Sequence, residues 1–203
     1  MLAGKIVIST TEGLAAATLT PRLVELRRGL PDVAFELAIS FELVDLLRGE
    51  ADIVLRHTRP GSPELVGRRI GTITYGLWAT DAYLAEHGIP RSTVELARHV
   101  LIQPAGELGR ITQARELRRW AGRSTELACN TMTGCAALVR SGAGIGTLSR
   151  YLAEAAPTLR RVLATSVEWT SPLWMLTRRE LARTARVRAV LDFLASSYRR
   201  SRL

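Results

Sequence analysis

The sequence alternates between short apolar runs and longer stretches with helical periodicity, and this alternation limits the folds open to it. The apolar run Ile6–Ile8 fits a buried strand. The stretch that follows, Gly13–Arg28, places apolar residues about every 3.6 positions, which is typical of an amphipathic helix. The same pattern recurs along most of the 203 residues. It predicts an α/β fold with largely parallel sheets.

Four local predictions are specific enough to be checked. Pro21 falls inside the first helical stretch, where it should either kink the helix or start its main body. The segment FELVDLLRG is expected to form a short helix capped by Ser40. Residues 64–80 are interpreted as two strands joined near Gly71. Residues 104–124 show no clear period and are expected to form short strands and loops.

The bulk composition argues against several classes of protein. Apolar residues make up 47% of the chain, and no run of 18 apolar residues predicts a membrane span. The start, MLAGKIVIS, lacks the features of a secretory signal, and two cysteines are too few for a disulfide scaffold, so we expect a cytoplasmic protein. The net charge of +9 permits contact with nucleic acid. Because the arginines are scattered, however, a solvated arginine-rich surface is the preferred interpretation.

The sequence predicts no catalytic site, no metal site and no cofactor. The three histidines, His57, His87 and His99, stand in no catalytic motif, and SGAGIG follows a helix rather than a strand, which is the wrong context for a dinucleotide loop. Cys129 and Cys135 have no partners at zinc-ligand spacing. Small buried apolar side chains are the preferred role for both cysteines, with a thiol switch at Cys129, beside a helix start, as the alternative.

Two segments, IVISTTEGLAA and ELACNTMTGCAALV, share one plan. Each leads from a strand through hydroxyl or amide residues into a helix. A helix N-terminus offers unpaired N–H groups and a partial positive charge, so these polar residues either cap the helix or help to grip a small anion between two lobes. Sequence spacing leaves both interpretations open. The residues concerned are Ser9, Thr10, Thr11, Asn130, Thr131 and Thr133.

Longer stretches carry a family resemblance. The segments GKIVISTTEGLAAATLTPRLVELRRGLPDVAFELAIS and VDLLRGEADIVLRHTRPGSPELVGRRIG are followed by LWATDAYLAEHGIP, NTMTGCAALVRSGAGIGTLSRYL and PLWMLTRRELARTARVRAVLDFL. In this order and spacing, the chain resembles the effector-binding domain of LysR-type transcriptional regulators. The resemblance covers nearly all of residues 4–197 and is weakest over 104–124.

The resemblance implies a periplasmic-binding-protein-like fold of type 2, with two Rossmann-like α/β lobes joined by two crossover strands. The first lobe is expected over 4–76 and 168–203, and the second over 77–167. It further implies a small-molecule effector, expected to be a carboxylate, in the cleft between the lobes. A homodimer or homotetramer that regulates genes in the cytoplasm is the implied assembly.

The resemblance also implies which residues touch the effector. They lie at the ends of the first three strands and in the second lobe. Arg56 is of special interest, because a buried guanidinium pairs well with a carboxylate, whereas the alternative is a surface or lobe-bridging arginine. The implied residues are Ser9, Thr10, Thr11, Ser40, Phe41, Arg56, His57, Gln103, Pro104, Asn130 and Thr131.

One departure from the family concerns DNA. The first strand is expected to begin at Lys5, so the family's winged helix-turn-helix has no place in this sequence, and DNA contact is expected only through that missing part. The leading alternative function is a solute-binding protein that serves a transporter. An enzyme built on the same scaffold ranks third, because no poised base or nucleophile is evident.

Overall fold

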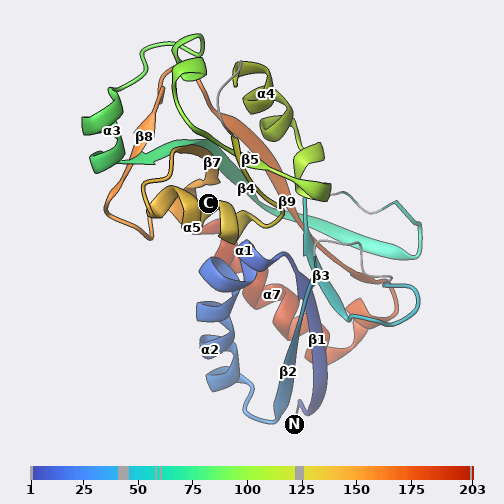
Figure 1. Ribbon diagram of the computed structural model, residues 1–203. Coiled ribbons are helices and arrows are strands. Elements are labelled where there is room, and N and C mark those ends of the chain that lie inside the picture. The colour runs from blue at the N-terminus through green and yellow to red at the C-terminus, as the bar shows by residue number, and fades with distance from the viewer. Residues whose placement is uncertain (1, 41–45, 58, 60, 122–125, 202) are drawn as a thin grey trace. The chain divides into compact units, whose positions relative to one another are not determined.

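The computed structural model describes residues 2–40, 46–57, 59, 61–121, 126–201 and 203. They divide into two compact units, here called unit 1 (Met1–Ile73 with Ser171–Leu203) and unit 2 (Thr74–Thr170). Two strands, β4 (Leu65–Thr80) and β9 (Trp169–Arg178), contribute residues to both units (Figure 1). Among the described residues, no helix combines the length and the apolar composition needed to cross a membrane.

The strands of unit 1 follow the order β2, β1, β3, β9. Strand β1 (Gly4–Thr10) lies parallel to both β2 (Val33–Ile39) and β3 (Ile53–Arg56), whereas β3 pairs with β9 in the antiparallel sense. The parallel pairing brings the carboxyl ends of β1 and β3 to one edge of the sheet, because Ser9 is paired with Val54.

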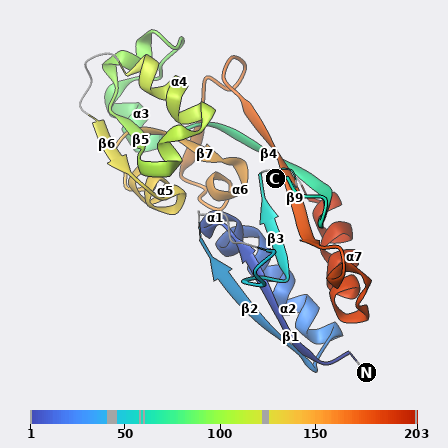
Figure 2. The ribbon, with the colours of Figure 1, turned by 90° about the vertical axis from the view of Figure 1, so that its right-hand side faces the viewer.

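The helices of unit 1 come from both ends of the chain. After β1 the chain forms α1 (Glu12–Leu14), a π-helical turn (Ala15–Leu19) and α2 (Thr20–Gly29). Pro21 stands in the first turn of α2, so the prediction that it starts the main helix is confirmed. Near the other end, a 3-10 turn (Leu181–Arg183) leads into α7 (Ala185–Arg199), which packs beside α2 (Figure 2).

Polar contacts join the π-helical turn and α2 to α7. The Tyr198 hydroxyl lies 2.9 Å from the Thr18 hydroxyl, and the Arg22 guanidinium lies 4.1 Å above the Tyr198 ring. Around these contacts the apolar face of α7 is buried, including Val187 and Leu194. Tertiary packing therefore fixes the C-terminal helix in unit 1.

Unit 2 has the strand order β4, β7, β5, β6, with β8 paired to β4. Strand β5 is parallel to both β6 and β7, and β4 is antiparallel to β7 and β8. The sheets are thus mixed. The two strands that contribute residues to both units are antiparallel to their neighbours here: β9 is antiparallel to β3, and β4 is antiparallel to β7 and β8. The four further strands of this unit are β5 (Leu101–Pro104), β6 (Glu126–Cys129), β7 (Ile145–Ser149) and β8 (Leu159–Val162).

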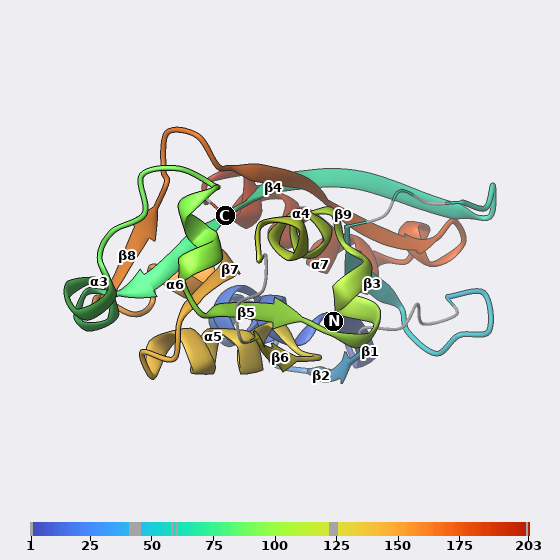
Figure 3. The ribbon, with the colours of Figure 1, turned by 45° about the horizontal axis from the view of Figure 1, so that its top comes forward.

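Helices cover both faces of the sheet of unit 2 (Figure 3). On one face Leu77, Leu101 and Ile145 pack with Leu117 of α4, and on the other Ile102 and Leu148 pack with Val139 of α5. Two 3-10 turns, Glu95–Arg98 and Gly106–Arg110, complete the unit. Its α-helices are α3 (Asp81–His87), α4 (Thr112–Trp120), α5 (Met132–Arg140) and α6 (Arg150–Ala153).

Two local predictions are wrong. Residues 65–80 form one strand of 16 residues, and Gly71 lies inside it rather than in a turn. A Cβ at Gly71 would stand 3.0 Å from the Leu203 side chain, so packing explains this glycine. In 104–124 the described residues form a 3-10 turn and α4, a helix whose exposed face is rich in arginine. Of the predicted helix FELVDLLRG, residues 41–45 lie outside the described residues, and 46–49 form a turn.

Candidate effector site

Unit 1 brings three of the predicted site residues together. Ser9 is fully buried at the end of β1, and Arg56, only 4% exposed, ends the neighbouring strand β3. Arg56 Nη2 donates to Ser9 Oγ at 3.1 Å and to the Ser40 carbonyl oxygen at 3.0 Å, while Nη1 donates to the Leu55 carbonyl oxygen at 3.1 Å. The surface-arginine interpretation of Arg56 is therefore wrong.

Burial sets the electrostatics of this edge. Desolvation lowers the pKa of Arg56 from 12.5 to about 10, so the guanidinium remains a cation at neutral pH. A positive charge held away from water interacts more strongly with an oxyanion than an exposed one does. The edge formed by Ser9, Ser40 and Arg56 is therefore suited to bind a negatively charged group.

His57 follows Arg56 and is neutral at pH 7. Its burial, together with the positive charge of Arg56, lowers its pKa from 6.5 to about 4. The Nδ1 atom of His57 lies 3.2 Å from the hydroxyl oxygen of Ser171. Ser171 was not predicted: it stands 114 positions away in sequence and reaches His57 only through the pairing of β3 with β9, which no local pattern announces.

The hydroxyls of Thr10, the last residue of β1, and of Thr11, which follows it, do not cap a helix. Thr11 occupies the N-cap position of α1 but makes no side-chain capping hydrogen bond. Thr10 is fully buried, and its hydroxyl donates to the Leu55 carbonyl oxygen at 3.4 Å. The alternative that these residues merely cap the helix is thus wrong for the N-terminal segment.

The predicted residues of unit 2 lie at the ends of β5 and β6. Gln103 and Pro104 are buried on β5 and pair with Ala128 and Cys129 of β6. Asn130, which follows β6, is exposed. These strand ends are held together where the chain leaves β5, because the Ala105 N–H donates to the Cys129 carbonyl oxygen at 2.8 Å.

Thr131 behaves differently from the hydroxyls of unit 1. Its Oγ1 accepts a hydrogen bond of 3.0 Å from the Gly134 N–H and so caps α5. The same Oγ1 lies 3.4 Å from the Thr133 hydroxyl. The capping interpretation is therefore correct for Thr131.

Cys135 is a buried thiol on the core-facing side of α5, and Cys129 is half-buried. The Cys135 thiol lies 3.6 Å from the Cys129 carbonyl oxygen, and burial raises the pKa of Cys135 to about 12. Cys135 is therefore an inert packing residue at neutral pH. Among the described residues, no three His, Cys, Asp or Glu side chains are grouped so that they could hold a metal ion.

The predicted site residues fall into two sets. Unit 1 holds Ser9, Thr10, Thr11, Ser40, Arg56 and His57, and unit 2 holds Gln103, Pro104, Asn130 and Thr131. Phe41 lies outside the described residues. That the two sets face one another across a shared cleft stays a prediction.

The sequence and the structure of this chain were compared with those of known proteins. The model of the LysR substrate binding domain matches residues 1–199. The regulatory domain of CrgA, a LysR-type transcriptional regulator from Neisseria meningitidis, superposes with a TM-score of 0.85 at 25% identity and covers 97% of this chain and 99% of that domain. The regulatory domain of AphB from Vibrio vulnificus has the same fold, with a TM-score of 0.73 at 21% identity over 96% of this chain and 98% of that domain.

Curated relatives are longer than this chain. The probable HTH-type transcriptional regulator LtrA of Klebsiella pneumoniae is 25% identical over 210 residues, which cover 96% of this chain and 66% of LtrA. CrgA of Neisseria meningitidis serogroup B is 26% identical and is matched over 87% of this chain and 61% of its own length. This chain therefore spans about two thirds or less of the relatives it matches.

These matches favour a regulator domain over a transporter's solute-binding protein. They also confirm the predicted periplasmic-binding-protein-like fold of type 2. Because the family model covers almost the whole chain, the chain belongs to the family of LysR substrate-binding domains.

Proposed function

We propose that this chain senses a small carboxylate on behalf of a cytoplasmic transcriptional regulator. The observation that carries the proposal is the buried Arg56 guanidinium at the carboxyl ends of two parallel strands, next to the hydroxyls of Ser9 and Thr10. Ligands of open α/β sheets bind outside the carboxyl ends of the strands. The family supports the same role, since its description is that of a substrate binding domain.

Each group at this edge has a distinct part in the proposed complex. Arg56 supplies the positive charge, and charge-assisted hydrogen bonds from a guanidinium match the two oxygens of a carboxylate. Ser9 and Ser40 hold the guanidinium in place through their hydrogen bonds to Nη2. His57 is neutral at pH 7, so the charge of Arg56 dominates the local field.

The signal would pass to DNA through a part of the protein outside this chain. The longer relatives LtrA and CrgA are named HTH-type regulators, which supports a helix-turn-helix in the full protein and a role without catalysis. Effector binding would shift the balance between conformations of a homodimer or homotetramer by binding one of them more tightly.

A thermal-shift screen of the 203-residue chain tests the proposal. Small aromatic and aliphatic carboxylates are compared with their neutral amides. At a concentration of about 100 times Kd, a true effector adds about 2.7 kcal/mol of stability, which raises Tm by about 5 to 10 °C. The amide of the same compound should raise Tm by much less.

The matched variants are Arg56→Gln and, as control, Arg119→Gln, an exposed arginine of α4. We expect Arg56→Gln to remove the shift and Arg119→Gln to keep it. A full shift in Arg56→Gln, or an equal shift with the neutral amide, would contradict the proposal.

A further inference from the structure

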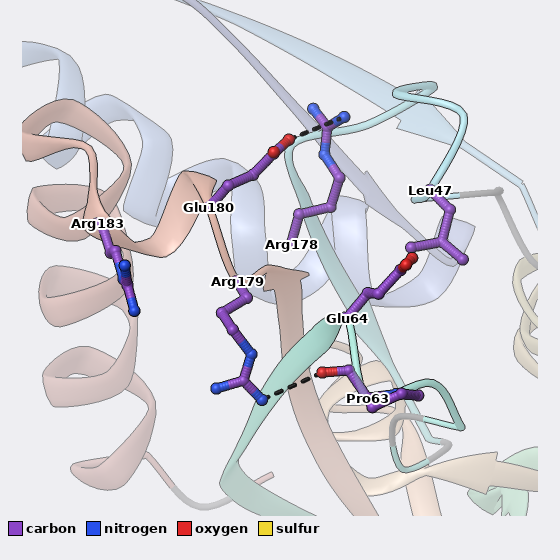
Figure 4. Close-up of a pocket in the computed structure, with 7 residues that line it drawn as sticks. All are labelled: Leu47, Pro63, Glu64, Arg178, Arg179, Glu180 and Arg183. Atoms are coloured by element: carbon purple, nitrogen blue, oxygen red, sulfur yellow. Dashed lines mark hydrogen bonds and ion pairs between the residues drawn. The ribbon is translucent and has the colours of Figure 1, made fainter.

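A charged pocket of about 540 Å³ lies in unit 1, away from the Arg56 edge (Figure 4). Strand β3 runs from Ile53, which is paired with Thr177, to Arg56, which is paired with Trp174. Because Arg178 follows Thr177, the pocket lies toward the opposite end of β3 from the proposed effector site. Its charged lining consists of Glu64, Arg178, Arg179, Glu180 and Arg183, and Leu47 and Pro63 add apolar wall.

The rim of the pocket is held by backbone hydrogen bonds. The Arg179 N–H donates to the Glu64 carbonyl oxygen at 2.9 Å, and Arg179 Nη2 donates to the Pro63 carbonyl oxygen at 3.1 Å. These two bonds join the turn before β4 to the turn after β9. The pocket is therefore preformed, so less conformational entropy of the protein is lost when a ligand binds.

Arg178 carries a charge that its surroundings compensate poorly. Its side chain is 24% exposed, and the carboxylate with which it forms an ion pair, that of Glu180, is 72% exposed at a distance of 3.5 Å. Arg178 Nε is buried and has no hydrogen-bond partner among the described residues. Because an ion pair with a solvated carboxylate stabilises a cation only weakly, an anion that adds hydrogen bonds to Arg178 would stabilise it further.

The charge of this region is positive beyond the pocket itself. Residues 171–203 carry eight arginines against two carboxylates, Glu180 and Asp192. Three guanidinium groups and two carboxylates line the pocket, and neither Arg183 nor Glu64 forms a side-chain ion pair among the described residues. Figure 4 shows the three arginines arriving from the end of β9, the next turn and the 3-10 turn before α7.

We propose that this pocket is a second ligand site, one that binds the phosphate group of a small phosphate monoester. A dianionic phosphate matches several guanidinium groups at once, and its oxygens accept bidentate hydrogen bonds from arginine. The volume exceeds the need of a free phosphate ion, and Leu47 and Pro63 offer apolar contact to the organic part. Free phosphate is the other source of the same chemistry.

Calorimetric titration of the 203-residue chain at constant ionic strength tests this site, with phenyl phosphate and inorganic phosphate as probes. We expect saturable binding of phenyl phosphate, and weaker binding of inorganic phosphate. Tighter binding of inorganic phosphate would overturn the assignment to a monoester. Arg178→Gln combined with Arg183→Gln should weaken phenyl phosphate at least tenfold.

Two controls separate this site from general charge and from the effector site. Arg115→Gln with Arg119→Gln removes the same charge from the exposed face of α4 and should change Kd less than twofold, as should Arg56→Gln. The Arg183 side chain makes no hydrogen bond or ion pair among the described residues. Arg183→Gln alone should still weaken phenyl phosphate binding at least threefold. Binding that does not saturate, that falls equally in the α4 variant, or that is lost in Arg56→Gln would overturn the proposal.

Discussion

The two units use the same sequence plan, a strand followed by hydroxyl residues and a helix, for different purposes. In unit 1 the hydroxyls of Ser9 and Thr10 are buried and bond to Arg56 and to the backbone of β3, and Thr11 caps nothing. In unit 2 Thr131 is exposed and caps α5. The difference arises from the neighbouring strand in each unit. Beside β1, strand β3 ends in the guanidinium of Arg56, whereas beside β6, strand β5 ends in Pro104. A local pattern therefore does not decide whether a hydroxyl caps a helix or bonds to a neighbouring strand.

The largest expected effect is the pH dependence of folding stability that His57 of unit 1 causes. Folding lowers the pKa of His57 from 6.5 to about 4, so its contribution to stability is complete above pH 6.5 and is lost as pH falls toward 4. The ceiling is about 3 kcal/mol, and we expect about 2 kcal/mol because part of the side chain reaches solvent. Urea unfolding at a series of pH values measures this loss.

His57→Gln should flatten that pH dependence, because no group remains to be protonated there. The matched change in unit 2 is His99→Gln, since burial also lowers the pKa of His99. We expect a smaller flattening in that variant. Equal slopes for the wild type and His57→Gln between pH 7 and 4 would refute the account of His57.

Ser9→Ala has an expected effect of comparable size. It removes the oxygen that accepts from Arg56 Nη2 and leaves a buried charged donor with one bond fewer, at a cost of about 1 to 3 kcal/mol. Chemical denaturation of Ser9→Ala, with Ser9→Thr as the variant that retains the hydroxyl, measures this cost. A loss below about 0.5 kcal/mol would mean that Ser9 does not position Arg56.

The smallest expected losses of stability concern the N-cap residues of α5 in unit 2 and of α1 in unit 1. Thr131→Ala should cost about 1 kcal/mol, the usual value of an N-cap, and Thr131→Ser should restore most of it. Thr11→Ala should cost less than about 0.5 kcal/mol, because its hydroxyl makes no capping bond. If Thr11→Ala proved the more damaging change, the contrast between the units would be wrong.

Local periodicity predicted most of the strands and helices, because β1, β2, β3 and β5 to β7 are short runs rich in apolar residues. It failed at Gly71, where a glycine inside a long strand makes room for Leu203, a residue 132 positions away. It failed again at α4, a nine-residue helix in which Ala114 and Leu117 are the buried apolar residues and most of the other residues are polar.

The candidate site was only partly readable from the sequence. The resemblance named Ser9, Ser40 and Arg56, and their hydrogen bonds show that these residues meet. The burial of Arg56 follows from sheet pairing, which a linear pattern does not contain. The bond between His57 and Ser171, and the pocket around Arg178, likewise depend on contacts between segments more than 100 positions apart.

The most direct test of the central claim is a crystal structure of this chain with the best carboxylate from the thermal-shift screen. We predict that a carboxylate oxygen lies about 3 Å from a guanidinium nitrogen of Arg56, with the Ser9 hydroxyl nearby. A carboxylate bound elsewhere on the chain, with the Arg56 guanidinium still engaged only by protein groups, would contradict the account.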